Sequence, residues 1–315
     1  MTTLSSIFGA VVGTRNSLYE RGIFRSQRLA GPVLSVGNIT VGGAGKTPFV
    51  IMLGEELKRR KIGFDVLSRG YGRKSRGVKL VNPDGIPSEF GDEPLVIARK
   101  LGVPVIVAEH RYDAGLFADQ RFGPQLHVLD DGFQHRQLAR DYDIVLVTPD
   151  DARDGLLPAG RLREGVSALR RADAVVLTPG AAPDGLPLEG KLVLRVERGI
   201  APTDVPPRPL AFCGIARPEN FFAQLRAANI ELAGEISFRD HHSYSLGDVL
   251  SLIERANANN GRGFITTEKD AINLGRLADG LQPLSIVPAT MKLVNAERAM
   301  SQILATIAER YQPPA

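Results

Sequence analysis

The sequence predicts an α/β protein of two domains, the first a three-layer α/β/α sandwich and the second a smaller α/β unit. Short apolar runs that resemble buried strands alternate with longer segments of helical periodicity, which is the pattern of parallel sheets covered by helices. A proline-dense stretch, APTDVPPRP at 201–209, interrupts this alternation, which then begins again. We therefore expect one domain over residues 1–203 and another over residues 204–315.

The elements follow from these runs in chain order. Apolar runs predict strands at 33–36, 64–67, 104–108, 126–131, 143–148 and 174–178, and then at 210–213, 232–238, 263–267 and 285–288. Helical periodicity predicts helices at 47–60, 91–101, 218–226, 246–256 and 295–311, with a short helix beginning at Lys269.

Length and composition exclude several classes of protein. The chain has 315 residues, which is long for one domain and sufficient for two. Its single cysteine, Cys213, excludes a disulfide framework and a cysteine-based metal site, and it fits a reducing cytoplasm. No apolar run approaches the roughly 20 residues that cross a bilayer, and the N-terminus lacks the basic start of a signal peptide.

An apolar stripe near the N-terminus has two interpretations. Apolar residues recur at helical spacing, and arginines follow between residues 15 and 28; the stripe is Leu4, Ile7, Phe8, Val11 and Val12. Such a helix suits a membrane interface, where its apolar face enters the lipid and its arginines meet anionic headgroups. The alternative, which the spacing alone favours, is that the stripe packs on the domain core.

A glycine-rich turn organises the first domain. It lies between the strand at 33–36 and the helix at 47–60, and its residues are Thr40, Val41, Gly42, Gly43, Ala44, Gly45, Lys46 and Thr47. In this strand–loop–helix setting, backbone N–H groups and the helix N-terminus surround a phosphate. Lys46 would reach the β- and γ-phosphates, and the Thr47 hydroxyl would hold Mg²⁺. The first domain is therefore P-loop NTPase-like, although Thr40 replaces the first glycine of the usual pattern. The alternative is a plain glycine turn with a surface lysine.

Residues 58–79 form a strongly basic segment, with nine lysines and arginines, one acid and a net charge of +8. Such a segment attracts phosphates, nucleic acid or an anionic membrane. Its only aromatic residues are Phe64 and Tyr71, so a phosphorylated ligand or an anionic lipid is favoured over nucleic acid. A solvated run of charges is the alternative, yet SRGYGR at 68–73 follows a strand and is typical of a ligand loop.

Acidic residues occupy three positions where chemistry is expected. Asp92 is either the N-cap of the helix at 91–101 or a general base beside the sheet, and spacing alone favours the cap. Asp130 and Asp131 end the strand at 126–131, where an acid beside a phosphate loop holds or orients Mg²⁺.

Two charged motifs remain open or are rejected as metal sites. GRLRE at 160–164 is equally compatible with site residues and with an exposed turn. Two adjacent histidines follow Asp240, but neighbouring residues rarely share one metal, and no cysteine or third histidine is close in sequence. A zinc site is therefore rejected.

Six motifs occur in order along the chain: GNITVGGAGKTP (37–48), SRGYG (68–72), GDEP (91–94), DDGFQH (130–135), GRLRE (160–164) and DHH (240–242). Together they resemble the tetraacyldisaccharide 4′-kinase family, the lipid A 4′-kinases of Gram-negative bacteria. The resemblance covers nearly the whole chain, and the threonine at position 40 is itself a feature of this family.

The resemblance implies a peripheral kinase on the cytoplasmic face of the bacterial inner membrane. It implies transfer of the γ-phosphate of ATP, with Mg²⁺, to the 4′-hydroxyl of a tetraacylated glucosamine disaccharide 1-phosphate, giving lipid IVA. The implied partners are this acylated lipid and the anionic membrane surface, with no nucleic acid and no obligate protein partner. The resemblance also favours the membrane interpretation of the N-terminal stripe.

The same resemblance implies roles for individual residues. Asp92 acts as the base and His241 supports it, against the cap interpretation. Thr47 and Asp131 are the expected metal ligands, with Asp130 and Glu164 as further candidates. The residues expected at the lipid headgroup are Arg69, Tyr71, Glu93, Arg111, Asp130, Gln134 and Glu164.

Two other classes of protein share part of this pattern. A partitioning ATPase has a similar glycine loop, but it carries a lysine where this chain has Val41. A GTPase needs an N-K-x-D guanine-reading motif, and TEKD at 267–270 has the wrong order. A non-catalytic nucleotide-dependent binding module is the third possibility. ATP turnover that requires an acylated disaccharide would distinguish the kinase from the partitioning ATPase and from the binding module.

Overall fold

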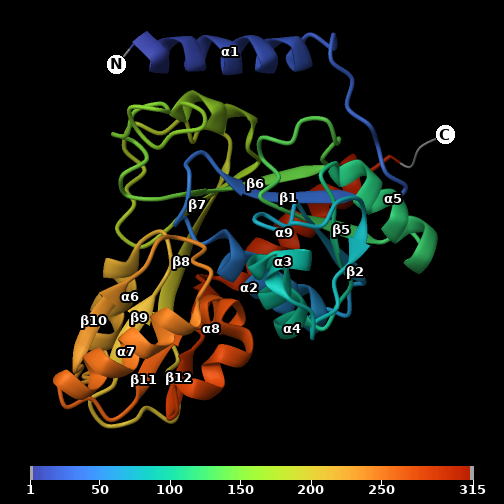
Figure 1. The fold of residues 1–315 in the computed structure, drawn as a ribbon. Helices are drawn as coiled ribbons and strands as arrows, with labels where there is room; N and C mark the ends of the chain where they lie inside the picture. The colour runs from blue at the N-terminus through green and yellow to red at the C-terminus, as the bar shows by residue number, and fades with distance from the viewer. Residues whose placement is uncertain (1–2, 313–315) are drawn as a thin grey trace.

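Two mostly parallel sheets make up the body of the protein in a computed structural model that describes residues 3–312 (Figure 1). The large sheet contains β1 (Val33–Asn38), β2 (Phe64–Ser68), β3 (Lys79–Leu80), β4 (Val105–Val107), β5 (Leu126–Asp130), β6 (Tyr142–Val147), β7 (Ala174–Leu177), β8 (Leu192–Ile200) and β13 (Ala289–Leu293). The small sheet contains β9 (Leu210–Cys213), β10 (Gly234–Ser237), β11 (Phe264–Thr267) and β12 (Leu284–Val287). Residues 1, 2 and 313–315, the ends of the two predicted domains, lie outside the described residues.

Helices cover both faces of the large sheet. On one face, α2 (Lys46–Arg59), α4 (Asp92–Leu101) and α9 (Ala296–Arg310) share the largest apolar core with the strands. The other face is covered by α5 (Arg111–Phe122), the 3₁₀-helix η1 (Val166–Arg171) and loops. A short helix, α3 (Pro87–Phe90), precedes α4. The three-layer α/β/α architecture predicted from the sequence is confirmed.

The small sheet is also sandwiched between helices. One face packs on α6 (Pro218–Ala227), and the other packs on α7 (Leu246–Ala258) and the 3₁₀-helix η2 (Gly275–Gly280). The short helix α8 (Glu268–Leu274) lies between the two units: its Leu274 belongs to the small core, whereas its Ile272 is buried in the large one. The two units are therefore packed against each other through α8.

Strand order places the ends of the site-bearing strands together. The large sheet runs β13-β8-β7-β6-β1-β5-β2-β4-β3, and the small sheet runs β10-β9-β11-β12. β1 lies in the middle of the large sheet between β5 and β6, and Val36 is paired with Asp130. Because β1 and β5 are parallel, the glycine loop after β1 and the acidic pair after β5 emerge at the same edge.

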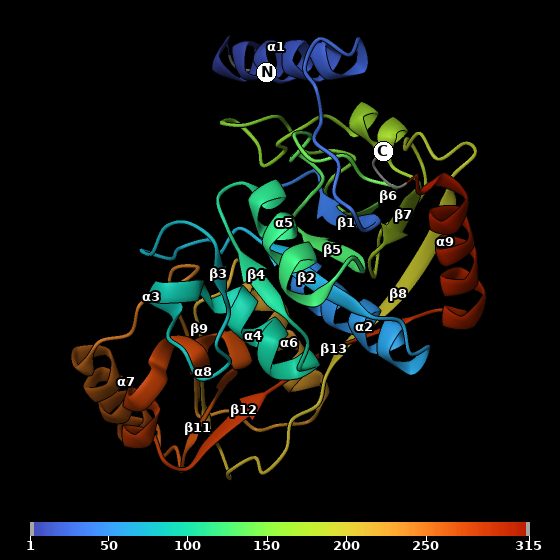
Figure 2. The same cartoon turned by 90° about the vertical axis from the view of Figure 1, so that its right-hand side faces the viewer.

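The smaller unit differs from the predicted 204–315, because the chain returns to the large sheet after β12. β13 pairs in antiparallel fashion with β8, from Ala289 opposite Ile200 to Leu293 opposite Val196, and α9 then covers the large sheet (Figure 2). Neither β8 nor β13 was predicted as a strand. In β8, the buried Leu194 and Val196 alternate with exposed charged residues, so no continuous apolar run marks this strand.

The N-terminal helix α1 (Thr3–Glu20) lies apart from both sheets, above the loops that follow β6 and β7 (Figures 1 and 2). Its predicted apolar stripe is divided between two faces. Leu4, Ile7 and Val11 are 65%, 57% and 64% exposed, whereas Phe8 and Val12 are half-buried. Packing of the whole stripe on the core, which the spacing favoured, is therefore wrong. Among residues 3–312, no helix is long and apolar enough to cross a membrane.

Candidate active site

The glycine loop between β1 and α2 has the backbone of a phosphate cradle. Gly42, Gly43 and Gly45 have φ values of 70°, 66° and 82°, and Gly45 is the N-cap of α2. This left-handed region is strained for residues with a Cβ, and a Cβ at Gly43 or Gly45 would also meet an arginine side chain. Thr40 is buried, and its hydroxyl accepts a hydrogen bond of 3.0 Å from the amide of Asn38. Thr40 therefore stabilises the backbone at the start of the loop from its buried side.

Lys46 connects this loop to the acidic pair after β5. Its ammonium donates to Asn38 Oδ1 at 3.1 Å and lies 3.3 Å from Asp131 Oδ1. Arg163, in the GRLRE motif, contacts the same Asp131 carboxylate at 2.8 Å. Burial raises the pKa of Asp131, but Lys46 and Arg163 outweigh burial and lower the pKa to about 2. Asp131 is thus a carboxylate already neutralised by two cations.

Asp130 differs from its neighbour because one of its oxygens has no partner. Ser68 donates to Oδ2 at 3.1 Å, whereas Oδ1 is buried without a hydrogen bond. Burial, together with the charges of Glu93 and Asp131, raises the pKa of Asp130 to about 7. A buried, unpartnered carboxylate oxygen is costly unless a cation or a donor approaches it.

The residues present fit Mg²⁺ that also binds phosphate oxygens. Within residues 3–312, no three acidic, histidine or cysteine side chains are grouped to enclose a metal. Mg²⁺ in kinases needs only one or two protein oxygens, because phosphate and water supply the others. Thr47 follows Lys46 in the first turn of α2, and the free Oδ1 of Asp130 lies at the adjacent strand end.

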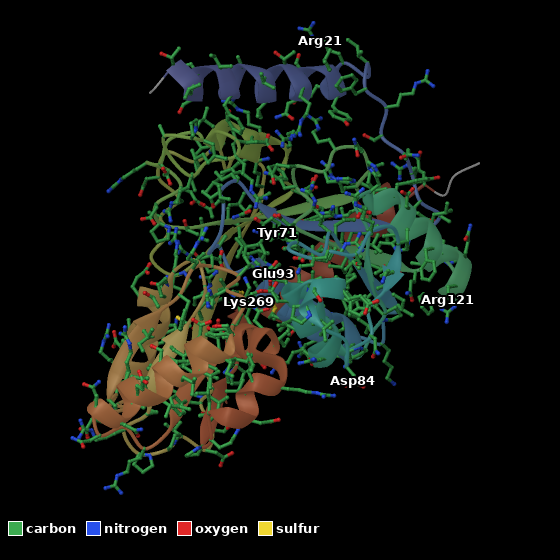
Figure 3. The ribbon with its side chains drawn as sticks, in the orientation of Figure 1. Arg21, Tyr71, Asp84, Glu93, Arg121 and Lys269 are labelled. Carbon is green, nitrogen blue, oxygen red and sulfur yellow. The ribbon has the colours of Figure 1, made fainter. Side chains whose placement is uncertain are left out.

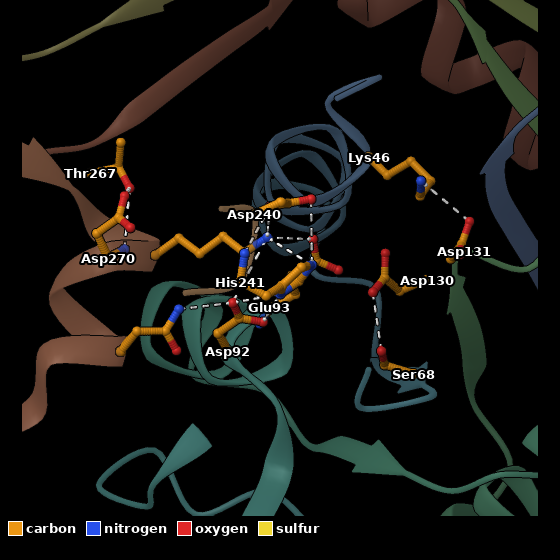
Figure 4. Close-up of polar contacts among 12 residues, drawn as sticks. Lys46, Ser68, Asp92, Glu93, Asp130, Asp131, Asp240, His241, Thr267 and Asp270 are labelled. Carbon is orange, nitrogen blue, oxygen red and sulfur yellow. Dashed lines mark hydrogen bonds and ion pairs between the residues drawn. The ribbon is translucent and has the colours of Figure 1, made fainter. Parts of the chain in front are cut away.

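Asp92 and His241 meet at the boundary between the two units (Figure 4). Asp92 begins α4 of the large unit, is 4% exposed and has its carboxylate 2.9 and 3.1 Å from Nδ1 of His241. Asn273 on α8 donates to the same carboxylate at 3.2 Å. Gly91, and not Asp92, is the N-cap of α4, so the cap interpretation of Asp92 is wrong.

The loop after β10 holds His241 in an unusual conformation. Its φ is 57°, in the left-handed region that few non-glycine residues adopt, and its N–H donates to the carbonyl of Gly214 at 3.1 Å. The ring of Tyr71 lies 5.0 Å away, centroid to centroid. A strained backbone, a carboxylate partner and an aromatic neighbour together orient this imidazole.

A lysine that sequence analysis did not single out completes the cluster. Lys269 on α8 reaches His241 Nε2 at 3.1 Å, Glu93 and Asp240 at 3.4 Å each, and Asp92 at 3.8 Å. Figure 3 shows Lys269, Glu93 and Tyr71 close together between the two units. The only sequence signal of Lys269 is its place in TEKD, directly after a strand of the second sheet.

Hydrogen bonds and charge govern ionisation in this cluster. Burial raises the pKa of Asp92, but the hydrogen bond with His241 and the charge of Lys269 outweigh burial and lower the pKa. Burial lowers the pKa of His241, and the hydrogen bond with Asp92 outweighs burial and raises it. Asp92 is therefore a carboxylate at neutral pH, as an acceptor of a hydroxyl proton must be.

Two further arginines missed by sequence analysis lie against the glycine loop. Arg198 on β8 donates to the carbonyl of Ala44, and the Arg217 side chain lies beside Gly43. Arg217 pairs with Asp150 at 3.1 Å. Burial and the proximity of Arg217 lower the pKa of Arg198 to about 10, and the Nε atoms of both arginines are buried without a partner. This excess of positive charge suits an anion on the loop.

Three of the predicted headgroup residues, Arg69, Tyr71 and Arg111, make up a surface that we call the basic wall. Arg111 is 4% exposed, donates to the carbonyl of Glu109 and has a buried, unpartnered Nε. Burial lowers the pKa of Arg111 to about 10, with Asp131 and Asp130 opposing the shift. Burial, together with Arg111, lowers the pKa of His135 to about 3, so this imidazole is neutral. Arg69 and the 64%-exposed Tyr71 are open to solvent.

Gln134 and Glu164 contact the structure around the site. The amide of Gln134 donates to the carbonyl of Asn38 at 2.9 Å, which supports the strand before the loop. Glu164 is 2% exposed and accepts from Asn16 of α1 at 2.6 Å, while Arg171 pairs with it at 3.0 Å. The Glu164 carboxylate therefore fastens α1 to the body, a role for which the motif GRLRE carries no signal.

Comparison with known proteins identifies the relatives of this chain. Residues 1–308 match the family model described as tetraacyldisaccharide-1-P 4′-kinase. The tetraacyldisaccharide 4′-kinase of Koribacter versatilis is 50% identical over 98% of this chain and 99% of the relative, and that of Aquifex aeolicus is 37% identical over 86% and 88%. The crystal structure of LpxK from Aquifex aeolicus in complex with ATP superposes with a TM-score of 0.78 at 34% identity, covering 98% of each chain.

Proposed function

Because the chain belongs to the tetraacyldisaccharide-1-P 4′-kinase family, we propose that it transfers the γ-phosphate of ATP to a tetraacylated glucosamine disaccharide 1-phosphate. The acceptor is the 4′-hydroxyl, and the product is lipid IVA, an intermediate of lipid A biosynthesis. The observation that carries the assignment is the Asp92–His241 hydrogen bond of 2.9 Å, at the boundary between the unit that holds the glycine loop and the smaller unit.

Asp92 accepts the proton of the sugar hydroxyl. Phosphoryl transfer requires the nucleophile to be held in line and relieved of its proton as the new bond forms. The ionised state of Asp92 supports this role, and the backbone N–H of Glu93 and the side chain of Asn273 fix the orientation of its carboxylate. His241 remains hydrogen-bonded to Asp92 and keeps the carboxylate oriented as the proton arrives.

The loop from Thr40 to Thr47 binds the phosphates of ATP. Its backbone N–H groups and the N-terminus of α2 surround the β-phosphate, and Lys46 reaches toward the transferred group. Thr47 and the acidic pair Asp130 and Asp131 would hold Mg²⁺, which would supply positive charge to offset that of the phosphates. The free Oδ1 of Asp130 supports its place in that set, whereas Asp131 also orients Lys46.

The basic wall binds the disaccharide headgroup. Arg69, Tyr71 and Arg111 present charge and an aromatic face, and Glu93 and Gln134 complete the expected headgroup contacts. An arginine whose Nε is buried and unpartnered gains a hydrogen bond when a phosphate or a sugar hydroxyl arrives.

The helix α1 brings the protein to the cytoplasmic face of the inner membrane. Leu4, Ile7 and Val11 are exposed on one face of α1, and the exposed Ile23 and Phe24 follow it. Arg21 and Arg25 are exposed beside them, and Figure 3 shows Arg21 at the end of α1, away from the body. Apolar area and positive charge together favour an anionic lipid surface.

The test is an assay of the purified protein with the lipid disaccharide phosphate and ATP–Mg²⁺. We expect phosphorylated lipid to form, and ATP turnover to depend on the lipid. ATP hydrolysis that is equally fast without lipid would favour a partitioning ATPase. ATP binding without any turnover would favour a nucleotide-dependent binding module.

A further inference from the structure

We propose that Lys269 is a positioning residue that holds His241 as the neutral tautomer with its proton on Nδ1, directed at Asp92. The inference rests on the proposed function only in taking Asp92 as the base. Lys269 is the second residue of α8, its side chain is 18% exposed, and its ammonium lies 3.1 Å from Nε2 of His241.

Hydrogen-bond chemistry allows one arrangement of protons here. An ammonium has three donors and no acceptor, so Nε2 of His241 must accept from Lys269 and carries no proton. The remaining ring proton is then on Nδ1, which faces both oxygens of Asp92 at 2.9 and 3.1 Å. Lys269, His241 and Asp92 thus form one directed chain, in which each N–H points toward the base.

The charges around His241 make the Lys269 ammonium necessary for keeping the imidazole neutral. The groups that face His241 are one aromatic ring, one ammonium and two carboxylates, namely Tyr71, Lys269, Asp92 and Asp240. A third carboxylate, Glu93, pairs with Lys269 at 3.4 Å. Burial lowers the pKa of His241, Asp92 and Asp240 raise it, and the charge of Lys269 opposes these two carboxylates. With Lys269 removed, the carboxylates would favour a second proton on the imidazole more strongly. Although burial opposes it, the combined charge of Glu93, Asp92 and Asp240 raises the pKa of Lys269, which therefore stays charged.

The protonation state affects the transfer step. The hydroxyl proton moves to an Asp92 oxygen as the new O–P bond forms, and the β-phosphate oxygen of ADP leaves with the electron pair of the broken bond. An imidazolium at position 241 would hold the Asp92 carboxylate in a strong charge-assisted hydrogen bond, which lowers its basicity. A neutral His241 donates a weaker bond and leaves the carboxylate able to take the proton.

Lys269 also connects the neutral state of His241 to the packing of the two units. Lys269 and His241 belong to the smaller unit, whereas Asp92 and Glu93 belong to α4. A second ion pair between the same helices, Lys100 with Glu268 at 2.5 Å, does not involve His241. Lys100 therefore provides a matched control for loss of α4–α8 contact alone.

The experiment compares Lys269→Met, Lys269→Arg and Lys100→Met with the unmodified protein in the lipid kinase assay. We expect Lys269→Met to lower kcat by about 10- to 100-fold, part of what a general base supplies, while KM for ATP changes little. The acidic limb of its kcat–pH profile should move up by about one pH unit, because His241 keeps its second proton to higher pH. Lys269→Arg should restore part of kcat, and Lys100→Met should resemble the unmodified protein.

Nitrogen-15 NMR of the histidines gives a readout that does not depend on activity. In the unmodified protein at neutral pH, His241 should show an unprotonated Nε2. The substitution Lys269→Met should raise the pKa of His241. A proton on Nε2, or equal losses of kcat in Lys269→Met and Lys100→Met, would overturn the proposal. Full activity in Asp92→Asn would instead overturn Asp92 as the base, while the NMR result would still decide the tautomer.

Discussion

Asp92 occupies a position where its chemistry and its structural role can be separated. It lies in the first turn of α4, but its carboxylate hydrogen-bonds with His241 and Asn273 across the boundary between the units. Asparagine retains the shape and one acceptor oxygen, yet it cannot take a proton at neutral pH. The substitution therefore tests proton transfer without opening a cavity.

We expect Asp92→Asn to lower kcat by about 100- to 10,000-fold, because it removes general base catalysis. KM for ATP should change little, since Asp92 is not part of the glycine loop. The matched control is Asp248→Asn in α7, which changes another aspartate that contacts a histidine, His242 at 3.3 Å, and should retain kcat. The measurements are kcat and the melting temperature of both variants; normal turnover in Asp92→Asn at unchanged stability would refute the base.

A second histidine, His127, links protonation to stability. It is fully buried in β5, with Nδ1 2.9 Å from Asp65 and Nε2 3.1 Å from Asp119. Burial lowers the pKa of His127, but the two carboxylates outweigh burial and raise it above its usual 6.5. The imidazolium is therefore favoured in the folded state over the unfolded state.

We expect this network to stabilise the protein fully below the ordinary histidine pKa. The stabilisation should disappear as the pH rises through the raised pKa of the folded state. The check is the melting temperature of the unmodified protein and of His127→Gln from about pH 5.5 to about pH 9. The difference between the two should shrink as the pH rises, whereas exposed His110→Gln should follow the unmodified protein throughout. A constant difference would show that His127 does not titrate in this range.

At the scale of elements, α1 separates its contacts from its exposed apolar face. Asn16 donates to buried Glu164, and Arg136 donates to the carbonyl of Asn16. These polar contacts hold the helix on the body without using Leu4, Ile7 or Val11. An amphipathic helix normally buries its apolar stripe in its own core, so this arrangement leaves the stripe available to another apolar phase.

We expect replacement of Leu4, Ile7 and Val11 together by serine to weaken binding to anionic liposomes by roughly 100-fold, since each side chain loses about 1 kcal/mol of burial in the interface. Activity on a detergent-dispersed lipid should be affected less. Replacement of Leu246 and Leu250, which are 63% and 53% exposed on α7, is the matched control and should leave binding unchanged. Liposome sedimentation checks both, and equal binding by all three proteins would exclude α1 as the membrane contact.

Elements were predictable wherever local pattern determined them. The apolar runs predicted β9 at its observed bounds and most other strands to within two residues, and GGAGKT predicted the loop and α2. β8 and β13 could not be predicted in this way, because a strand whose buried and exposed residues alternate becomes recognisable only from the partner it pairs with. Lys269 was missed for a similar reason: its importance lies in three carboxylates and a histidine that the fold brings to it.

At the scale of the whole molecule, two chain crossings connect the units. The chain leaves the large sheet after β8, builds the small sheet, and returns through β13 to α9. The crossings are adjacent, because Ile200 at the end of β8 is paired with Ala289 at the start of β13. The smaller unit, with His241 and Lys269, is thus an insertion into the large one, and the site forms only where the two meet.

Because of this topology, we expect opposite outcomes from two deletions. Ending the chain after residue 203 removes α9, whose Met300, Ile303 and Ile307 are buried in the large core. Those three side chains contribute about 5 to 9 kcal/mol, which is comparable to the total stability of about 5 to 15 kcal/mol of a typical protein. We expect this fragment to be unfolded or insoluble, although the proline-rich stretch made position 203 look like a domain end.

Replacing residues 201–288 by a short glycine-containing turn should instead give a folded protein. The turn would convert β8 and β13 into a β-hairpin with their present register, so the large sheet and α9 stay complete. We expect cooperative thermal unfolding and retained ATP binding through the glycine loop, weakened by the loss of Arg217. Phosphoryl transfer should be lost, because Asp92 remains without His241 and Lys269. Circular dichroism, nucleotide titration and the lipid kinase assay measure the three outcomes. A deletion protein that fails to fold, or one that still phosphorylates lipid, would contradict the view that the smaller unit is an insertion that completes the site.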